Sequence, residues 1–394
     1  MDITNTITSV PGFKVSSVDA GLRKEPSPDL TLIVAEAPCT AAGVFTTNYV
    51  KAAPVLYDQE RLAANPEGIR AVLINAQVAN AVTGQEGLRN ARQTAAWTAR
   101  AIGATADDVL VMSTGVIGIQ LPMDKMEPGI AAAAKALRAD GWQEAARGIM
   151  TTDTKPKIAA VQSDGITILG IAKGAGMMAP HMATMLSAIV TDADISADLL
   201  HRALKRAVYH SFNRITVDGD MSTNDTVLLL ASGVSDVRIA DRTLEPFVKA
   251  LRAVCEQLAK GIVHDAEGAT RFIEIWVTSA RSEDDAHQIA NTIAISPLVK
   301  TAFYGGDANW GRIFMAAGRA GIAFDPARLS LWFGDLQLVD KGMPLAYDET
   351  QANALAASKE VKVTLDLGLG GADFVVWTCD LSHEYVTING HYRT

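Results

Sequence analysis

Short apolar runs and amphipathic stretches alternate irregularly along the chain. Eight runs are short, rich in apolar or β-branched residues and bounded by Gly, Pro or Asp, which predicts strands. They lie at 30–35, 71–74, 109–112, 167–171, 226–230, 272–277, 361–367 and 374–380, and 185–191 is also strand-like. The segment GLGGA joins the runs at 361–367 and 374–380. Its glycines supply the positive φ of a tight turn, so these two strands are expected to form a hairpin.

Six stretches repeat apolar residues at a spacing near 3.6, which predicts helices. They lie at 88–102, 129–139, 196–209, 243–259, 284–296 and 348–358, several behind a Ser, Thr or Asp that can cap the first turn. Helices and strands alternate without a regular βαβ rhythm. This order favours an α+β fold over a doubly wound sheet.

Composition narrows the class of protein. The 394 residues are 48% hydrophobic and 20% charged, as in a globular protein with one large domain or two to three ordinary ones. The formal net charge is −9. This sign argues against binding to nucleic acid or to an anionic membrane surface, because both require a basic face.

Other signals of location and metal binding are weak. The start MDITNTITSV has no basic or long apolar region, so no secretory signal or transit peptide is expected. No apolar stretch reaches the length of a membrane span. Three scattered cysteines form no CxxC pair, and the seven histidines show no metal-ligand spacing. We therefore expect a cytoplasmic protein without a metal or disulfides.

The Gly- and Met-rich segment at 173–184 lies between two strand-like runs. Gly174, Gly176 and Ala179 match the dinucleotide pattern G-x-G-x-x-[GA]. However, Pro180 stands where the first helical turn should run, and a β-branched run follows. A nicotinamide site is therefore disfavoured, and the simpler interpretation is a loop that passes close to other backbone.

Seven longer sequence motifs, spread over most of the chain, resemble those of a known enzyme family. They are STGVIG at 113–118, IMTTDTKPK at 149–157, KGAGMMAPHMATML at 173–186, SFNRITVDGDMSTNDT at 211–226, DAEGATR at 265–271, SPLVKTAFYGGDANWGR at 296–312 and YVTINGHYRT at 385–394. In these seven motifs, the chain resembles the ornithine acetyltransferase (glutamate N-acetyltransferase) family of arginine biosynthesis. The resemblance implies an α+β fold in four layers, an α/β/β/α sandwich of the self-processing kind.

The resemblance also implies self-cleavage between Ala183 and Thr184. The products would be an α chain, 1–183, and a β chain, 184–394, intertwined in one structural unit with a smaller C-terminal part and paired as α2β2. A threonine hydroxyl is a weak nucleophile that needs an adjacent base. The freed α-amine of Thr184, with a reference pKa of roughly 7.7–8.0, would supply it, so the nearby His181 is not needed as a base.

In the resembling enzymes the threonine takes the acetyl group of N2-acetyl-L-ornithine and passes it to L-glutamate. Thr114 and Gly115 match the positions that stabilise the oxyanion, one with a hydroxyl and the other by allowing close backbone approach. The substrate contacts match Thr151, Lys173, Thr184, Glu267, Asn389 and Thr394. Thr152 is an equivalent neighbour of Thr151, and which substrate group Lys173 or Glu267 binds stays open. The last residues would lie near the site, so a C-terminal tag or deletion is expected to impair activity.

Two further polar motifs are expected to stabilise the fold and not to bind a metal or take part in catalysis. Asp218, Asp220, Asn224 and Asp225 depart from the spacing of a calcium loop, which favours a turn held by side-chain hydrogen bonds. The residues Asp307, Asn309, Trp310 and Arg312 are expected to fix a loop and the start of a helix.

One sequence motif departs from the pattern of the family. Its pattern NSGNANACTG appears here as NAQVANAVTG at 75–84. If this loop shapes the acceptor pocket or supports the oxyanion donors, substrate preference would differ. Two alternatives are also kept: an amidase or aminopeptidase of the same self-processing fold that uses water, and a non-catalytic amino-acid-binding relative. The presence of Thr184, Lys173, Glu267 and both oxyanion positions argues against the second. No cofactor is expected, and use of acetyl-CoA as a second acetyl donor is left open.

Overall fold

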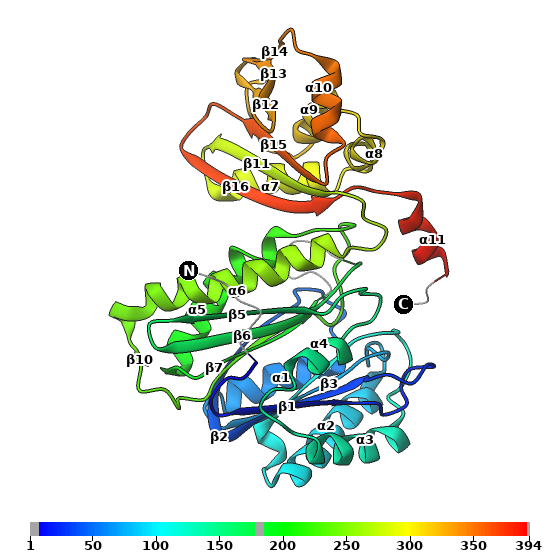
Figure 1. Cartoon of the computed structure of the whole chain (residues 1–394), viewed down its shortest axis with the longest axis vertical. Coiled ribbons are helices and arrows are strands. Elements are labelled where there is room, and N and C mark those ends of the chain that lie inside the picture. The colour runs from blue at the N-terminus through cyan, green and yellow to red at the C-terminus, as the bar shows by residue number, and fades with distance from the viewer. Residues whose placement is uncertain (1–7, 178–184, 392–394) are drawn as a thin grey trace.

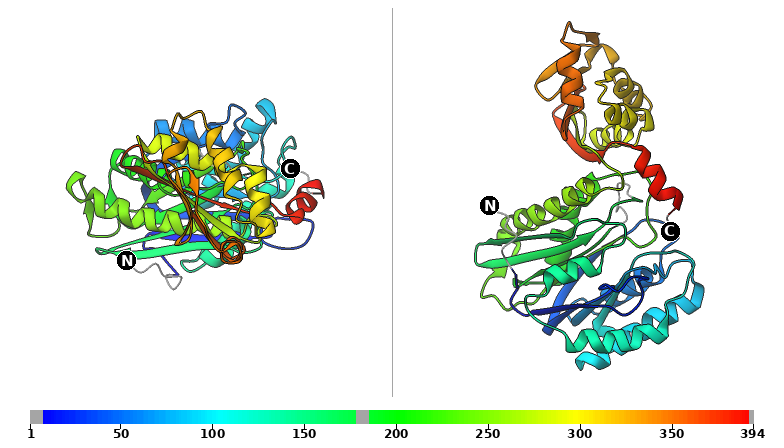
Figure 2. Two further views of the ribbon diagram at one scale, coloured as in Figure 1. Left: turned by 90° about the horizontal axis from the view of Figure 1, so that it is seen from above. Right: turned by 45° about the vertical axis from the view of Figure 1, so that its right-hand side comes forward.

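The computed structural model describes residues 8–177 and 185–391. The chain forms a larger unit from about the first two thirds of the sequence and a smaller unit that begins with β11 (Phe272–Ala280), with the helix α11 (His383–His391) beside their junction (Figures 1 and 2). Within the described residues no helix is long and apolar enough to cross a membrane.

The larger unit is built on a mixed sheet that bends. Its strands are β1 (Phe13–Val18), β2 (Leu30–Phe45), β3 (Ile69–Asn75), β4 (Val109–Ser113), β5 (Lys157–Ser163), β6 (Ile166–Lys173), β7 (Leu186–Thr191) and β9 (Thr226–Ala231). The order is β4-β3-β2-β9-β7-β6-β5, with β1 also paired to β2. The first half of β2 pairs with β3 and the second half with β9, and the register shifts between Val34 and Cys39. One long strand thus connects two half-sheets.

The strands of both half-sheets are apolar on both faces, so each half-sheet is covered on both sides. The two half-sheets pack against each other on one side and against helices on the other. Leu32 of β2 packs against the cluster formed with the helices α1 (Ala53–Ala64), α2 (Gly84–Ile102) and α3 (Met123–Lys135). Its neighbour Ile33 points the other way and packs with Leu228 and Leu230 of β9 between the half-sheets. On the outer face, Leu229 packs with helices α5 (Ala197–Tyr209) and α6 (Leu244–His264). The four-layer α/β/β/α prediction is confirmed.

The smaller unit has its own sheet and core. Its strands are β11 (Phe272–Ala280), β12 (Ser330–Phe333), β13 (Leu336–Asp340), β14 (Met343–Pro344), β15 (Glu360–Asp366) and β16 (Ala372–Cys379), in the order β14-β13-β12-β15-β11-β16. The helices are α7 (Glu283–Ala294), α8 (Pro297–Gly305), α9 (Trp310–Gly318) and α10 (Glu349–Ala356). The predicted helix start is confirmed, because the Asn309 side chain accepts a hydrogen bond from the Arg312 amide.

The predicted hairpin at 361–380 is wrong. β11 lies between β15 and β16, parallel to the first and antiparallel to the second. The glycine-rich segment crosses the end of β11, where the amides of Leu367 and Leu369 donate to the carbonyls of Thr278 and Ser279 at 3.0 and 2.7 Å. Turn residues indicate that the chain reverses direction. They do not indicate whether the two strands pair directly or with a third strand between them.

Candidate active site

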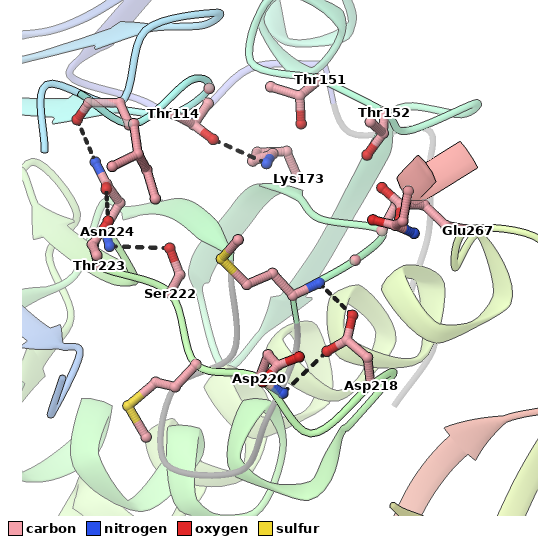
Figure 3. A pocket seen from close by; sticks show the side chains of 18 of the residues that line it. Thr114, Thr151, Thr152, Lys173, Asp218, Asp220, Ser222, Thr223, Asn224 and Glu267 are labelled. Atoms are coloured by element: carbon pink, nitrogen blue, oxygen red, sulfur yellow. Dashed lines mark hydrogen bonds between the residues drawn. The ribbon is translucent and has the colours of Figure 1, made fainter. Parts of the chain in front are cut away.

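A pocket of about 420 Å³ opens in the larger unit, where the loops after β4, β6 and α6 meet α11 (Figure 3). It brings together six of the predicted site residues: Thr114, Gly115, Thr151, Lys173, Glu267 and Asn389. Thr152 also lines it, so the ambiguity with Thr151 remains. The predicted residues Ala183, Thr184 and Thr394 lie outside the described residues, as does His181, which was not expected to act as a base.

Lys173 is the buried cation of this pocket. It ends β6 with only 3% of its surface exposed, and its Nζ donates to Thr114 Oγ1 at 3.0 Å. Burial lowers the pKa of Lys173, while the carboxyl groups of Asp153, Asp225 and Glu267 oppose that shift and the charge of Lys157 adds to it. The Lys173 side chain is thus hydrogen-bonded to a predicted oxyanion donor and also lines the pocket where a substrate would bind.

Only glycine fits at position 115, because the backbone of another loop packs directly against it. Its φ is +132°, and a Cβ there would lie 2.0 Å from the carbonyl carbon of Gln77. The Val116 amide donates to the Gln77 carbonyl at 3.0 Å, and the Ala79 amide donates back to Val116 at 3.0 Å. The loop 75–84, where the sequence departs from the family pattern, therefore supports the predicted oxyanion segment, and Ala79 also lines the pocket.

Glu267 and the loop after β6 lie in close contact. A Cβ on Gly176 would meet Glu267 Oε2 at 2.4 Å, and Asn389 Nδ2 donates to the same oxygen at 2.8 Å. β6 and β7 are adjacent and antiparallel, with Lys173 opposite Leu186. Two antiparallel neighbours cannot be the parallel strands of a βαβ unit, which removes the structural basis of a dinucleotide site. The contact of Gly176 with Glu267 supports the interpretation that the glycines allow close approach.

The word VDGDMSTND forms a turn at the pocket wall, as predicted. Asp218 Oδ1 accepts from the Asp220 amide at 3.2 Å, and Asp218 Oδ2 accepts from the Met177 amide at 2.6 Å and from the Tyr385 hydroxyl at 3.0 Å. Asp225 is fully buried, and its Oδ1 accepts from the Met185 amide at 2.9 Å. In the ranges 8–177 and 185–391, no three His, Cys, Asp or Glu side chains gather as a metal site.

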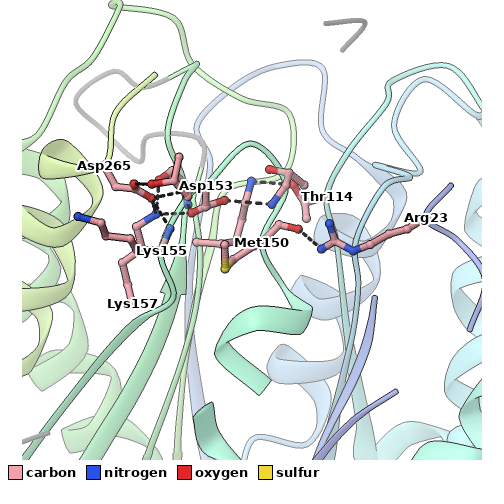
Figure 4. A network of polar contacts seen from close by, with 11 residues as sticks. Arg23, Thr114, Met150, Asp153, Lys155, Lys157 and Asp265 are labelled. Carbon is pink, nitrogen blue, oxygen red and sulfur yellow. Dashed lines mark hydrogen bonds and ion pairs between the residues drawn. The ribbon is translucent and has the colours of Figure 1, made fainter. Parts of the chain in front are cut away.

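A buried charge cluster behind the pocket was not predicted from the sequence (Figure 4). Lys157 Nζ lies 2.5 Å from Asp153 Oδ1 and 2.6 Å from Asp265 Oδ2. Asp153 also accepts from the amides of Gly174 at 2.7 Å and Thr151 at 3.0 Å. Asp153 thus fixes Thr151 and the residue after Lys173, and Asp265 holds Lys157 and the amide of Thr154 in the same cluster.

Known proteins resemble the chain along its whole length. A model of the ArgJ family matches residues 14–394. The chain belongs to the ArgJ family. It is 48% identical to the arginine biosynthesis bifunctional protein ArgJ of Thermotoga neapolitana, over 97% of this chain and 99% of that one. The protein of the same name from Geobacter sulfurreducens is 47% identical, over 98% and 100% of the two chains.

A solved structure agrees with this assignment. The crystal structure of arginine biosynthesis bifunctional protein ArgJ from Bacillus halodurans is 40% identical and has a TM-score of 0.50. The match covers 51% of this chain and 96% of that chain.

The departing loop of this ArgJ-family chain carries backbone strain. Gln77, Asn80 and Val82 have φ values of 75°, 50° and 57°. Val82 is 65% exposed, so little packing offsets the cost of a β-branched residue in the left-handed region, about 1–2 kcal/mol.

We expect Val82→Asn to raise the free energy of unfolding by about 1 kcal/mol, because Asn tolerates this region better. Chemical denaturation measures the change. Val50→Asn is the matched control, since Val50 is 52% exposed at an ordinary φ. An equal change in both variants would mean that backbone strain is not the cause.

The helix α11 rests on the pocket through polar side chains and buries none of its own residues. Tyr385 reaches Asp218 and Asn389 reaches Glu267. We expect Asn389→Ala to raise KM by about tenfold, the equivalent of one hydrogen bond to a charged group. Steady-state kinetics measure it, with Val386→Ala on the exposed face of α11 as the control. An unchanged KM would contradict a role of α11 in substrate binding.

Proposed function

We propose that the chain is an arginine-biosynthesis acetyltransferase that moves the acetyl group of N2-acetyl-L-ornithine to L-glutamate. The products are ornithine and N-acetylglutamate, and the intermediate is an acetyl ester on Thr184. The observation that carries the proposal is the convergence of Thr114, Gly115, Lys173 and Glu267 on one pocket in an ArgJ-family chain.

The proposed nucleophile is joined to a fixed part of this site. Thr184 precedes Met185, whose amide donates to Asp225 and whose carbonyl accepts from the Thr226 amide at 3.1 Å. In self-cleavage, the Thr184 hydroxyl would attack the carbonyl of Ala183 and expel its own amine. Water would then hydrolyse the resulting ester and leave a free α-amine on Thr184.

That amine acts as the base of the transfer reaction. It takes the hydroxyl proton as Oγ attacks the acetyl carbonyl, and returns a proton to the departing α-amine of ornithine. The Thr114 hydroxyl and the Gly115 amide would donate to the oxyanion. The amine of glutamate then attacks the ester and releases Thr184. Lys173 and Glu267 offer opposite charges for the carboxylate and an ammonium group of the amino acids.

The pairing of strands explains how two cleaved chains would stay together. β6 lies before the proposed cleavage site and β7 after it, yet they pair along six positions from Ile168 with Thr191 to Lys173 with Leu186. β9 then pairs with β2 of the first half. The Bacillus halodurans chain matches over nearly its full length but covers half of this one, which supports two chains of similar size. Assembly to α2β2 and a cytoplasmic location stay predictions.

Acetyl-CoA is proposed as a second acetyl donor, on the support of the word "bifunctional" in the relatives' names. No separate cofactor is proposed, because the acyl transfer needs only a nucleophile, a base and oxyanion donors.

Incubation of the purified protein with N-acetylornithine and isotopically labelled glutamate tests the function. We expect ornithine and labelled N-acetylglutamate in equal amounts. Ornithine with acetate and no N-acetylglutamate would instead identify the amidase alternative. Replacing N-acetylornithine with acetyl-CoA tests the second donor in the same assay.

A further inference from the structure

The contact between Lys173 and Thr114 determines how the Thr114 hydroxyl is used. A protonated lysine has three N–H donors and no acceptor, so at the observed 3.0 Å Thr114 Oγ1 must accept. Its own proton is then left for another acceptor. Thr114 lines the pocket, where that acceptor would be the oxyanion. A neutral lysine could accept this proton instead, and the oxyanion would lose a donor.

The protonated state of Lys173 therefore matters, and four charged or titratable groups influence it. Asp153 lies before β5, Asp225 at the start of β9 and Glu267 after α6, while Lys157 of β5 repels it. Burial raises the pKa of Asp225 well above its usual range, which favours the neutral carboxyl. Burial acts in the same direction on Asp153 and is the largest single cause, but the charges of Lys173 and Lys157 and the hydrogen bonds from Gly174 and Lys157 together outweigh it, and the pKa of Asp153 is lowered. Asp153 is thus the fully buried group that holds a negative charge near Lys173.

Asp153 also fixes the backbone around the lysine. Its Oδ1 accepts from the amide of Gly174, the residue directly after Lys173, and its Oδ2 from the amide of Thr151. The third contact, from Lys157, anchors the carboxylate to β5. These bonds hold the carboxylate in one orientation.

We propose that Asp153 is a positioning residue for acetyl transfer: it keeps Lys173 charged, and the charged lysine directs the Thr114 hydroxyl toward the oxyanion. This inference rests on the proposed function. It assigns Lys173 an effect on the oxyanion donor in addition to any contact with substrate.

The test is the pH dependence of kcat in Asp153→Asn, which keeps the size of the side chain and removes its charge. In the wild type, kcat should rise as the α-amine of Thr184 loses its proton and fall at higher pH as Lys173 loses its own. Without the charge of Asp153 the pKa of Lys173 falls, so the alkaline limb should move down by about one pH unit or more. At the pH of the wild-type alkaline limb, kcat should drop about tenfold, with KM changed less.

Asp265→Asn is the matched control. It removes the other carboxylate bound to Lys157, and Asp265 is not among the groups with the largest influence on the pKa of Lys173. Its alkaline limb should stay at the wild-type pH. An unshifted limb in Asp153→Asn, or an equal shift in both variants, would overturn the proposal.

A second variant covers the case in which Asp153→Asn does not fold or does not cleave itself. Lys173→Arg carries a charge that is not lost in the accessible pH range. Its alkaline limb should disappear whatever its absolute rate, and a limb at the wild-type pH would overturn the proposal. Failure of the wild type itself to transfer acetyl would instead refute the proposed function.

Discussion

Thr184→Ala is expected to give one uncut chain that transfers no acetyl group. The substitution removes the Oγ that would attack the Ala183 carbonyl, and the base is lost too, because the α-amine is never freed. We expect acetyl transfer to fall by about 10⁴-fold or more, as when a nucleophile is deleted from a group of residues that act as a unit. A denaturing gel measures cleavage and steady-state kinetics measure transfer.

Thr184→Ser is the matched control for this variant. It retains a hydroxyl and, after cleavage, an α-amine, so it should produce two fragments and measurable transfer. Cleavage at the same bond in Thr184→Ala, or transfer close to the wild-type rate, would refute Thr184 as the nucleophile.

Gly115→Ala is expected to lower kcat by about 10²–10³-fold, the effect of losing an oxyanion donor. The new Cβ would overlap the carbonyl carbon of Gln77 at 2.0 Å, so the segment 114–116 and the loop 75–84 must separate. That movement would displace both proposed donors, the Gly115 amide and the Thr114 hydroxyl. Kinetics on folded protein, checked by circular dichroism, give the measurement.

Gly118→Ala separates this effect from backbone strain in general. Gly118 lies in the same word and has a φ of +84°, but a Cβ there meets nothing within 4 Å. This control should lose about 1 kcal/mol of stability and keep its kcat within about twofold. If both variants lost the same fraction of kcat, the clash with Gln77 would not explain the loss.

Local patterns predicted about half of the helices and strands, missing for example α1 and β5, and did not predict how the elements associate. The strands at 30–35 and 226–230 were expected separately, yet nothing local shows that β2 continues to Phe45, where it reaches β9. The fully buried strands read as plain apolar runs, which do not say which sheet face packs on helices and which on the other half-sheet. The four layers came from the resemblance to a family. The hairpin at 361–380 failed because β11, about 90 residues earlier in the chain, lies between its two strands.

The site was predicted through the resemblance to a family and not from residue types alone. Lys173, Glu267 and Thr114 were identified as matching positions, and they share the pocket. Asp153, Tyr385 and the contact partners of Asp218 were missed, because their function depends on long-range pairing. Lys157 and Asp265 are 108 residues apart, and Asp218 and Tyr385 are 167 apart. No spacing rule connects such pairs, although both members lie in the words that carry the family resemblance.

The most direct test of an acetyl-threonine mechanism is the intact mass of the protein after incubation with N-acetylornithine and no acceptor. Two fragments are expected, and the one that begins at Thr184 should carry the added mass of one acetyl group, which disappears when glutamate is supplied. A single uncut chain that still transfers acetyl, or an acetyl group on the other fragment, would contradict the mechanism.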